Sequence, residues 1–466
     1  MLIKAQSQSL TGQLVERFAA RIRDRLLAPG TRLPSIRECA RQQGVSPHTV
    51  VSAYDQLLAQ GLVQSRKNRG FFVREAPGQI LADNVSAPMG PSHATALIRA
   101  MFHGVSAKPQ PGMGVFPPDW LAAEFMSSAM RKVVRSGALQ SFSLQYGEPA
   151  GDAGLRNLLA QRLNGMDIHC APQQIVTTVG ATHALDVVSR TLLRAGDPVM
   201  VEEPGWTVEF ARLEALGMRI LPVPRGQDGP DLDVMARLCE EHAPKLFVSV
   251  SVLHNPTGHS LSPGSAHRIL QLAHRYGFHV VEDDTYSHIA PEHATRLCAL
   301  DGLRRTIYVS GFAKILAPNW RVGFLAAPQD LVERMIDTKL LSTLTTPALM
   351  EKAIAICIEQ GQLRRHAERI RTRLDTARTR SVRLALAAGC HFAAEPRGLF
   401  GWVDTGVDTD ALAQRMLDEG YLLAPGALFH AARKASTLMR INFATTQDAG
   451  FWDSLARQRR LSGAAH

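Results

Sequence analysis

The stretch Ser310-Gly311-Phe312-Ala313-Lys314 follows an apolar run at residues 306–309, and Arg321 stands seven residues after the lysine. From residue 112 onward, similar apolar runs alternate with segments of helical periodicity. This alternation predicts a mostly parallel sheet with helices on both faces. In such α/β folds, ligands bind at the carboxyl ends of the strands. Lys314 therefore stands where a lysine can form a Schiff base, with an ordinary surface lysine as the alternative.

Other polar residues also follow predicted strands, which places them at the same edge of the sheet. The predicted strands span residues 175–179, 199–201, 245–252, 278–282, 306–309 and 322–326, and two of the helices span residues 182–193 and 264–276. Gly180-Ala181-Thr182 ends the first strand and opens a helix, where backbone amides and the helix dipole suit a phosphate. The chain has no Walker A lysine and no GxGxxG motif, so a nucleotide is not indicated.

Three further residues at strand ends suit an aromatic ring that carries polar groups. Asn255, before Pro256, can donate a hydrogen bond to a phenolate oxygen, or it is a turn residue. Asp283, three residues before Tyr286, can pair with a protonated ring nitrogen, or it caps a turn. Trp206 can stack on the ring, or it belongs to the core.

Two arginines indicate an anionic ligand. Arg321 can clamp a phosphate through two hydrogen bonds, or it is a surface guanidinium. Arg440 lies inside the apolar, strand-like run Leu438-Met-Arg-Ile-Asn-Phe. Because arginine is seldom buried without a partner, an acidic ligand is the better interpretation of Arg440.

The first 75 residues have a different pattern, which predicts three helices and a hairpin. Leu14, Phe18, Ile22 and Leu26 recur every fourth residue on a first helix. Ser35 and Glu38 have capping-box spacing at the start of a second helix, and Ser46 caps a third. Five apolar positions of the third helix are expected to face the first two helices: Val50, Ala53, Tyr54, Leu57 and Leu58. Two short strands, 62–65 and 71–74, flank the tip Arg66-Lys67-Asn68-Arg69-Gly70.

Charge separates this region from the rest of the chain. Residues 1–75 hold 12 Lys and Arg against 5 Asp and Glu, so they carry +7 of the total net charge of +10. A winged helix-turn-helix with a basic hairpin would place its third helix in the DNA major groove and its hairpin along the backbone. Winged helices also bind proteins, and a basic face can simply be solvated, so both alternatives remain.

The six cysteines form no CxxC motif and no Cys/His cluster, which argues against a zinc site or a disulfide framework. No run of 18 apolar residues occurs, and the first residues have no apolar core of signal-peptide length. We therefore expect no bound metal and a cytoplasmic protein with reduced thiols.

The stretch Gly30-Thr-Arg-Leu-Pro-Ser-Ile-Arg-Glu-Cys-Ala, followed by Gly44-Val-Ser and Thr49-Val-x-x-Ala-Tyr-x-x-Leu, resembles the GntR family of bacterial repressors. The resemblance implies that Arg37 grips a DNA phosphate. Many members have an arginine where this chain has Pro47, so more of the base reading would fall on the residues that follow. The implied DNA-binding residues are Ser35, Arg37, Ser46, His48, Thr49, Ser52, Arg66, Lys67, Arg69 and Gly70.

The motifs of residues 112–460 resemble, in their order, the fold type I, class I aminotransferases. This implies that Lys314 binds pyridoxal 5′-phosphate covalently, that Asp283 holds the proton on its ring nitrogen, and that Asn255 and Tyr286 donate to its 3-oxygen. Further implied contacts are ring stacking by Trp206 and phosphate binding by Ala181, Thr182, Arg321 and, from a neighbouring subunit, Tyr146. Arg440 would bind a substrate carboxylate. Position 311, often Ser or Thr in that family, is Gly, so either Ser310 substitutes or the contact is lost.

A GntR-type DNA reader joined to an aminotransferase-like domain is the layout of the MocR family of regulators. The expected organisation is a winged helix-turn-helix at 8–75, a linker at 76–111 and an aminotransferase-like domain at 112–460, with a small subdomain from about 330. The resemblance implies a homodimer that binds promoter DNA, pyridoxal 5′-phosphate and an amino-acid or amine effector. A working aminotransferase is the alternative, because every residue needed for a first transamination is present. A DNA-binding protein with an inactive second domain fits poorly with the intact Lys314 and Asp283.

Overall fold

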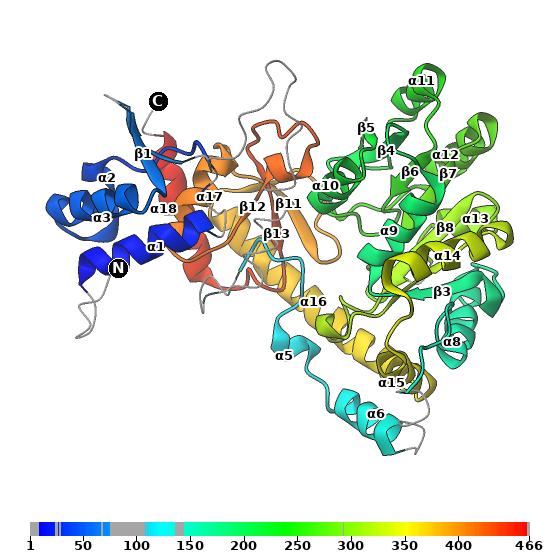
Figure 1. Ribbon diagram of the computed structural model, residues 1–466. Coiled ribbons are helices and arrows are strands. Elements are labelled where there is room, and N and C mark those ends of the chain that lie inside the picture. The colour runs from blue at the N-terminus through cyan, green and yellow to red at the C-terminus, as the bar shows by residue number, and fades with distance from the viewer. Residues whose placement is uncertain are drawn as a thin grey trace. The chain divides into compact units, whose positions relative to one another are not determined.

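The computed structural model divides the chain into two compact units, Met1–Val105 and Ser106–His466 (Figure 1). It describes residues 9–23, 27, 29–66, 69–74, 108, 110–135, 144–291 and 293–463, without the side chains of 462 and 463. Most of the predicted linker, 76–111, lies outside these residues. No helix in the described ranges is long and apolar enough to cross a membrane.

The first unit has the predicted three helices and a hairpin. They are α1 (Leu10–Arg23), α2 (Ile36–Gln43), α3 (Pro47–Ala59), β1 (Val63–Arg66) and β2 (Gly70–Val73). The hairpin is antiparallel, and Arg66 pairs with Gly70 at its tip. Gly70 has a φ of +95°, a conformation that glycine adopts without steric strain.

The core of the first unit explains why its helices form where they do. Leu14 and Phe18 of α1 pack against Tyr54 of α3, whose hydroxyl donates to the Pro34 carbonyl. The prediction for Leu58 is wrong, because its side chain is 42% exposed near the end of α3. Leu26 lies outside the described residues.

Both predicted helix caps of this unit are present. The Ser35 hydroxyl accepts from the Glu38 amide at 3.3 Å, and the Ser46 hydroxyl accepts from the Thr49 amide at 3.1 Å. The Glu38 carboxylate accepts from the side chain of Gln42.

The second unit contains a seven-stranded sheet with the order β3-β9-β8-β7-β6-β4-β5. Its strands are β3 (Ile175–Thr178), β4 (Pro198–Glu203), β5 (Arg219–Pro224), β6 (Leu246–Ser249), β7 (His279–Asp283), β8 (Thr306–Gly311) and β9 (Gly323–Ala326). Five neighbouring strands are parallel to one another, in the order β5, β4, β6, β7 and β8. Strand β9 is antiparallel to both β8 and β3. The predicted mostly parallel sheet is therefore present.

Helices cover both faces of this sheet, because alternate residues of a strand point to opposite faces. Val199 and Val201 of β4 lie in the same cluster as residues of α9 (Ala181–Leu192) and α14 (Val332–Thr343), whereas Met200 packs with residues of α11 (Leu232–His242) and α12 (Pro263–Tyr276). The helices of this region are α8 (Ala153–Asn164), α9 (Ala181–Leu192), α10 (Thr207–Ala215), α11 (Leu232–His242), α12 (Pro263–Tyr276), α13 (Leu297–Asp301) and α14 (Val332–Thr343).

A second, antiparallel sheet with the order β10-β11-β13-β12 lies in the C-terminal part of this unit. Its strands are β10 (His391–Phe392), β11 (Phe400–Asp404), β12 (Ala424–Pro425) and β13 (Leu438–Asn442). The other α-helices among the described residues are α5 (Pro118–Leu121), α6 (Glu124–Arg135), α15 (Ala348–Glu359), α16 (Gln362–Ala387), α17 (Thr409–Asp418) and α18 (Ala449–Gly463). The predicted subdomain start near 330 precedes α14, whose Val332 and Met335 pack with the seven-stranded sheet.

One strand ends earlier than its apolar run. The run 245–252 predicts a strand, but β6 stops at Ser249 because the Glu202 carboxylate accepts the hydrogen bond of the Val250 amide at 3.0 Å. The chain then forms the loop that carries Asn255. A side chain from β4 therefore decides where this loop begins.

Candidate functional site

Lys314 lies just after β8 and its amine faces other charged groups of the second unit. Its Nζ donates to the Gly114 carbonyl at 2.7 Å. Burial first, and then the positive charge of Arg440, lower the pKa of Lys314 from 10.5 to about 8, while Asp283 acts in the opposite direction. Arg440 of β13 and Asp283 of β7, which belong to different sheets, therefore both act on this one amine.

Asp283 is one of three consecutive acidic residues, and its neighbours have other partners. Glu282 accepts from the Leu297 and Cys298 amides, and Asp284 accepts from Arg296 at 2.7 Å and from the Tyr308 hydroxyl. Asp283, at the end of β7, accepts from the Thr285 amide, two residues later, at 3.1 Å.

The electrostatics of Asp283 differ from those of an exposed carboxylate. Burial raises the pKa of Asp283 from 3.8 to about 6, against the lowering effect of the Thr285 hydrogen bonds. A cationic partner would restore the charged form of a buried carboxylate, because an opposite charge favours ionisation. Asp283 is therefore suited to bind a cation near Lys314.

Arg440 and Asn255 bind each other across the two sheets of the unit. The Arg440 Nη1 donates to the Asn255 Oδ1 at 2.9 Å, and its Nη2 donates to the Gly112 carbonyl at 2.6 Å. The guanidinium lies 4.4 Å from the centre of the Phe400 ring and 5.1 Å from that of Phe429. Its buried Nε has no hydrogen-bond partner within the described residues.

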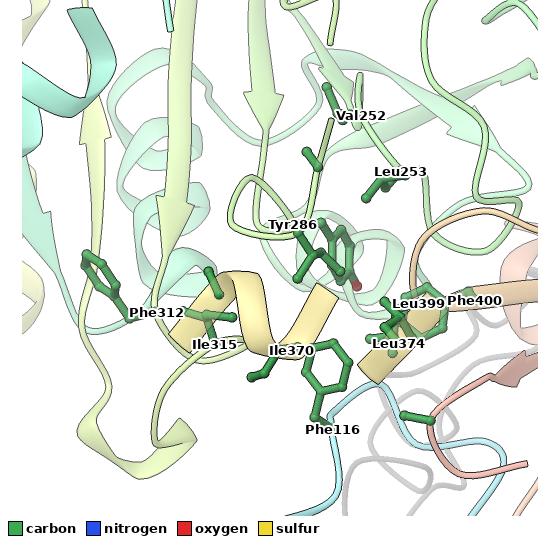
Figure 2. Packing of buried hydrophobic residues seen from close by; sticks show 14 of the residues in the cluster. Phe116, Val252, Leu253, Tyr286, Phe312, Ile315, Ile370, Leu374, Leu399 and Phe400 are labelled. Carbon is green, nitrogen blue, oxygen red and sulfur yellow. The ribbon is translucent and has the colours of Figure 1, made fainter. Parts of the chain in front are cut away.

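Tyr286 belongs to the apolar cluster beneath this site. Its ring packs edge-on against Phe400, with a centroid distance of 5.6 Å (Figure 2). Burial raises the pKa of the Tyr286 hydroxyl, and Arg440 opposes that shift. The neutral hydroxyl is therefore favoured, and it remains a hydrogen-bond donor near Arg440.

Arg321 lies against the N-terminus of α9. Its Nη2 donates to the Val179 carbonyl at 3.0 Å, and a Cβ added to Gly180 would lie 2.6 Å from the same nitrogen. Ala181 and Thr182 form the first turn of this helix and are half-buried. A guanidinium beside unbonded helix amides is a suitable place for a phosphate.

The positions of Ser310 and Gly311 bear on whether Ser310 can replace the phosphate contact that a Ser or Thr at position 311 would make. The Ser310 hydroxyl donates to the Asp284 carbonyl at 2.9 Å and lies 3.3 Å from the Ser287 hydroxyl. A Cβ added to Gly311 would lie 3.4 Å from the Ala181 amide nitrogen. Position 311 therefore faces the start of α9, and both possibilities, substitution by Ser310 and a lost contact, remain predictions.

Trp206 and Tyr146 are the two remaining residues that were predicted to contact the cofactor. Trp206 precedes α10 and is half-buried against the cluster that contains Val199 and Val201. Tyr146 is 81% exposed, and the nearby Leu144 is 82% exposed. Both predicted roles, ring stacking and reaching a second subunit, remain predictions.

Sequence reasoning missed the segment that contributes the backbone partners of Lys314 and Arg440. Gly112 and Gly114 supply these carbonyls, and the Asn442 side chain donates to the Met113 and Val115 carbonyls at 2.9 and 2.7 Å. Backbone acceptors leave no side-chain signature. The two glycines beside the end of the predicted linker were the signal that could have found this segment.

In the first unit, the predicted DNA-binding residues lie at the surface or at helix ends. Arg37 is exposed in the first turn of α2, and His48 is exposed in the first turn of α3. Thr49 and Ser52 are half-buried on α3. Ser35 and Ser46 are the caps described above.

The hairpin brings together more basic residues than predicted. Arg66, whose guanidinium lies 4.7 Å from the centre of the Phe72 ring, is exposed, as are Arg69 and Gly70. Arg32, which sequence reasoning did not select, forms an isolated antiparallel β-bridge with Phe72. Its Nε would lie 3.6 Å from a Cβ added to Gly70. Lys67 lies outside the described residues.

Comparison with known proteins identifies both units. The family described as "Aminotransferase class I and II" matches residues 121–451, and the one described as "Bacterial regulatory proteins, gntR family" matches residues 10–73. The first of these matches covers more than half of the chain.

Two relatives are named as regulators. The uncharacterized HTH-type transcriptional regulator YisV of Bacillus subtilis is 26% identical over 437 residues, with 90% of each chain covered. The probable rhizopine catabolism regulatory protein MocR of Rhizobium meliloti is 29% identical over 371 residues, which cover 77% of this chain and 73% of that protein.

One similar solved structure is LysN, an alpha-aminoadipate aminotransferase from Thermus thermophilus. It superposes with a TM-score of 0.72 at 25% identity, and the match covers 79% of this chain and 96% of the LysN chain. The second unit thus has the fold type I architecture of these transferases. The chain belongs to the aminotransferase class I and II family, and its N-terminal gntR-family domain gives it the make-up of a MocR-type transcriptional regulator.

Proposed function

We propose that this protein is a transcriptional regulator whose aminotransferase-like domain binds pyridoxal 5′-phosphate and an amino-acid or amine effector. The observation that carries the proposal is that Lys314 and Arg440 lie together, since a Cβ added to Gly114 would be within 3.8 Å of both side chains. Asp283 and Arg321 are close enough to act on the pKa of the same amine. The same chain carries a gntR-type DNA-binding domain.

The residues around Lys314 suit the polar groups of the cofactor. Asp283, which is buried and accepts hydrogen bonds from the uncharged Thr285, suits the protonated ring nitrogen. Arg321 and the first turn of α9 suit the phosphate. The lowered pKa of Lys314 gives its amine a larger neutral fraction near pH 7 than an exposed lysine has, and the neutral amine is the nucleophile.

The orientation of Asn255 supports its predicted role. Because its Oδ1 accepts from Arg440, its amide NH₂ group is left to donate, as a phenolate oxygen requires. Tyr286 has a raised pKa and so keeps its proton to donate to the same oxygen. Arg440 would bind the carboxylate of an amino acid. When bound, the cofactor supplies an electron sink for charge that develops on the carbon beside the amine.

The proposed assembly is a homodimer. Tyr146 and Leu144 are exposed in the single chain, as is Leu341 at 92%. A contiguous patch of exposed apolar side chains is typical of a surface that another chain covers. A second copy would place Tyr146 at its partner's phosphate, and two DNA readers would then match two half-sites of an operator.

The alternative is an enzyme that transfers the amino group of an amino acid. Arg440, Lys314 and Asp283 supply carboxylate binding, a base and ring protonation, and the superposed LysN is an aminotransferase. Turnover of an amino acid with an added 2-oxo acid separates the two functions. A regulator would use the site for binding, without sustained turnover.

The proposal is tested by the purified full-length protein in two steps. Borohydride treatment with pyridoxal 5′-phosphate, followed by peptide mapping, should find the pyridoxyl group on Lys314. The DNA retained by the protein should be sequenced and then bound again as a defined operator. A pyridoxyl group on another lysine, or a fragment of residues 76–466 that still binds this operator, would contradict the proposal.

A further inference from the structure

Residues 144–152, which we call the Tyr146 loop, combine an exposed tyrosine with a firmly bound backbone. The Tyr146 side chain is 81% exposed. The backbone groups of the loop that other residues bind are the Gly147 amide, the Pro149 and Ala150 carbonyls and the Asp152 amide. The exposed tyrosine is therefore attached to a segment whose own position is fixed.

Lys339 of α14 binds the middle of this loop. Its side chain is fully buried, and its Nζ donates to the Pro149 carbonyl at 2.8 Å and to the Thr346 hydroxyl at 3.4 Å. Burial lowers the pKa of Lys339 to about 8, while the negative charge of Glu351 opposes that shift. The buried ammonium group therefore lies close enough to Glu351 to be stabilised by its charge.

Thr346 and Glu351 lead from Lys339 back to the loop. The Thr346 hydroxyl donates to Glu351 Oε1, and Glu351 Oε2 accepts from the Asp152 amide at 2.7 Å. A line of hydrogen bonds thus leaves the Tyr146 loop at Pro149, passes through three buried side chains and returns to the loop at Asp152. We call these three side chains, Lys339, Thr346 and Glu351, the clamp.

Strand β3 holds the same loop from a second direction. The Thr177 amide donates to the Ala150 carbonyl at 2.9 Å, and the Thr177 hydroxyl lies 3.0 Å from that of Thr346. A Cβ added to Gly151, which has a φ of +101°, would lie 1.8 Å from the Thr177 hydroxyl oxygen. Glycine at this position therefore lets the loop pack directly on β3 beside the clamp.

The buried charge of Lys339 fits a role in positioning better than a role in stability. Apolar side chains of similar volume often replace buried ion pairs without loss of stability, because burying the charges costs so much free energy. A hydrogen-bonded ammonium group does, however, define the place of its acceptor. The Gly147 amide, next to Tyr146, is also bound by the Thr345 hydroxyl at 3.3 Å, adjacent to the clamp. What this arrangement holds in place is an exposed tyrosine.

We propose that Lys339 is a positioning residue that acts across the homodimer: through the clamp, it holds Tyr146 of one subunit where its hydroxyl donates to the cofactor phosphate bound in the other. This inference rests on the proposed function, which expects Tyr146 at that phosphate, and adds the residues that hold the tyrosine there. The alternative is an effect within one subunit, because Lys339 also acts on the pKa of His183 in the first turn of α9.

The affinity of full-length variants for pyridoxal 5′-phosphate, measured by equilibrium dialysis, tests the clamp. Lys339→Met removes the ammonium group at similar volume and should weaken affinity roughly tenfold, about 1.4 kcal/mol, as for one hydrogen bond to a charged group. Thr346→Val interrupts the clamp without removing a charge and should act in the same direction, whereas Thr346→Ser keeps the hydroxyl and should retain wild-type affinity.

Lys352→Met is the matched control for the loss of a lysine at this loop. Lys352 Nζ lies 2.7 Å from the Asp152 carboxylate, but its side chain is 38% exposed. Because surface ion pairs contribute little, this variant should bind the cofactor like the wild type.

Mixed dimers separate an effect across the dimer from an effect within one subunit. Two full-length chains with different tags are co-expressed and purified through both tags. Each mixed dimer carries Lys314→Ala once and Lys339→Met once, so it has a single Lys314. In the first dimer the substitutions are on different chains, and the remaining Lys314 receives an unaltered Tyr146 loop. In the second they are on the same chain, and the remaining Lys314 receives the altered loop.

Borohydride labelling of Lys314 over a range of pyridoxal 5′-phosphate concentrations gives the result. The second dimer should need roughly tenfold more cofactor than the first for half-maximal labelling. If Lys339→Met does not fold, Thr346→Val takes its place in both dimers. Equal labelling of the two dimers, the reverse order, or an equal loss of affinity in Lys352→Met would overturn the role of Lys339 alone. A wild-type protein that is not labelled at Lys314 would instead overturn the proposed function.

Discussion

The two units of this protein place their functional side chains in opposite environments. In the DNA-binding unit, Arg37, His48 and Arg69 are exposed, and each is held by a short helix or turn of its own. In the aminotransferase-like unit, Arg440 is 5% exposed and the pKa of Lys314 is lowered to about 8 by burial and by Arg440. A polyanion such as DNA binds to charges at the surface, whereas a small ligand needs charges that water does not screen.

The difference also concerns distance along the chain. The residues that would contact DNA fall between Arg32 and Gly70, whereas the second site joins Gly112 to Arg440. A substitution in the first unit should therefore have a local, graded effect on DNA binding. In the second unit, we expect substitution of one charged residue to change the pKa values of others, because Asp283 and Arg440 both act on the pKa of Lys314. This contrast can be tested by experiment, beginning with the largest expected effect.

Lys314→Ala should abolish covalent capture of pyridoxal 5′-phosphate, because no other amine in the described part of the chain is positioned among Asp283, Arg321 and Arg440. Borohydride fixation and mass spectrometry measure the capture. Lys339 is a matched comparison within the same protein, since its pKa is also lowered to about 8 by burial, but its Nζ donates to the Pro149 carbonyl at 2.8 Å. Label on Lys339 in place of Lys314 would mean that burial, rather than the site, selects the lysine.

Asp283→Asn should weaken retention of the cofactor by roughly 100-fold, about 3 kcal/mol, as expected when one partner of a buried ion pair is lost. Equilibrium dialysis of the cofactor measures this. Asp284→Asn is the control, because Asp284 bonds to Arg296 and Tyr308 and should lower the melting temperature instead. Equal cofactor loss in both variants would remove the distinction between the two acids.

The rate at which cofactor-free protein captures pyridoxal 5′-phosphate should rise with pH up to about 8 and then level off. The pKa of Lys314 is about 8, so the neutral amine falls roughly tenfold for each pH unit below that value. Absorbance after rapid mixing between about pH 6.5 and 9.5 gives the profile. A rate that continued to climb to the top of this range, as for an exposed lysine, would show that Lys314 is not buried among cations.

Arg37→Ala should weaken binding to all DNA sequences and lower the slope of log affinity against log salt by about one, as for the loss of one phosphate contact. His48→Ala should instead relax sequence preference at one position of each half-site. Binding to the recovered operator and to a scrambled duplex over a range of salt separates these effects. An unchanged salt slope for Arg37→Ala would mean that this arginine does not contact a phosphate.

The fold of each unit could be predicted from sequence because its signals are local. Ser35 and Ser46 cap helices that begin one residue later, and apolar runs become the strands of the seven-stranded sheet. The error at Leu58 arose near a helix end, where the predicted apolar face was no longer covered. Element boundaries also depended on distant residues, as Glu202 shows for the end of β6.

The sequence predicted the parts of the candidate site that side chains form, but not the parts that backbone carbonyls form. Lys314, Asp283 and Arg440 stand out because charged side chains follow or interrupt apolar runs. The segment with Gly112 and Gly114 does not, since its contacts with Arg440 and Lys314 are glycine carbonyls separated by 328 and 200 residues from their donors. Likewise, the sequence could not show that the Ser310 hydroxyl donates to the Asp284 carbonyl.

The central claim is that the buried site controls the exposed one. Operator titrations on cofactor-free protein, on protein with pyridoxal 5′-phosphate and on protein with the conjugate N-(5′-phosphopyridoxyl)-L-alanine test it most directly. We predict that the affinities differ by roughly 5- to 150-fold, the range of 1–3 kcal/mol typical of coupling between sites, and that Lys314→Ala reduces the response. Three superimposable binding curves, from protein shown to bind both compounds, would contradict the account and favour the enzyme.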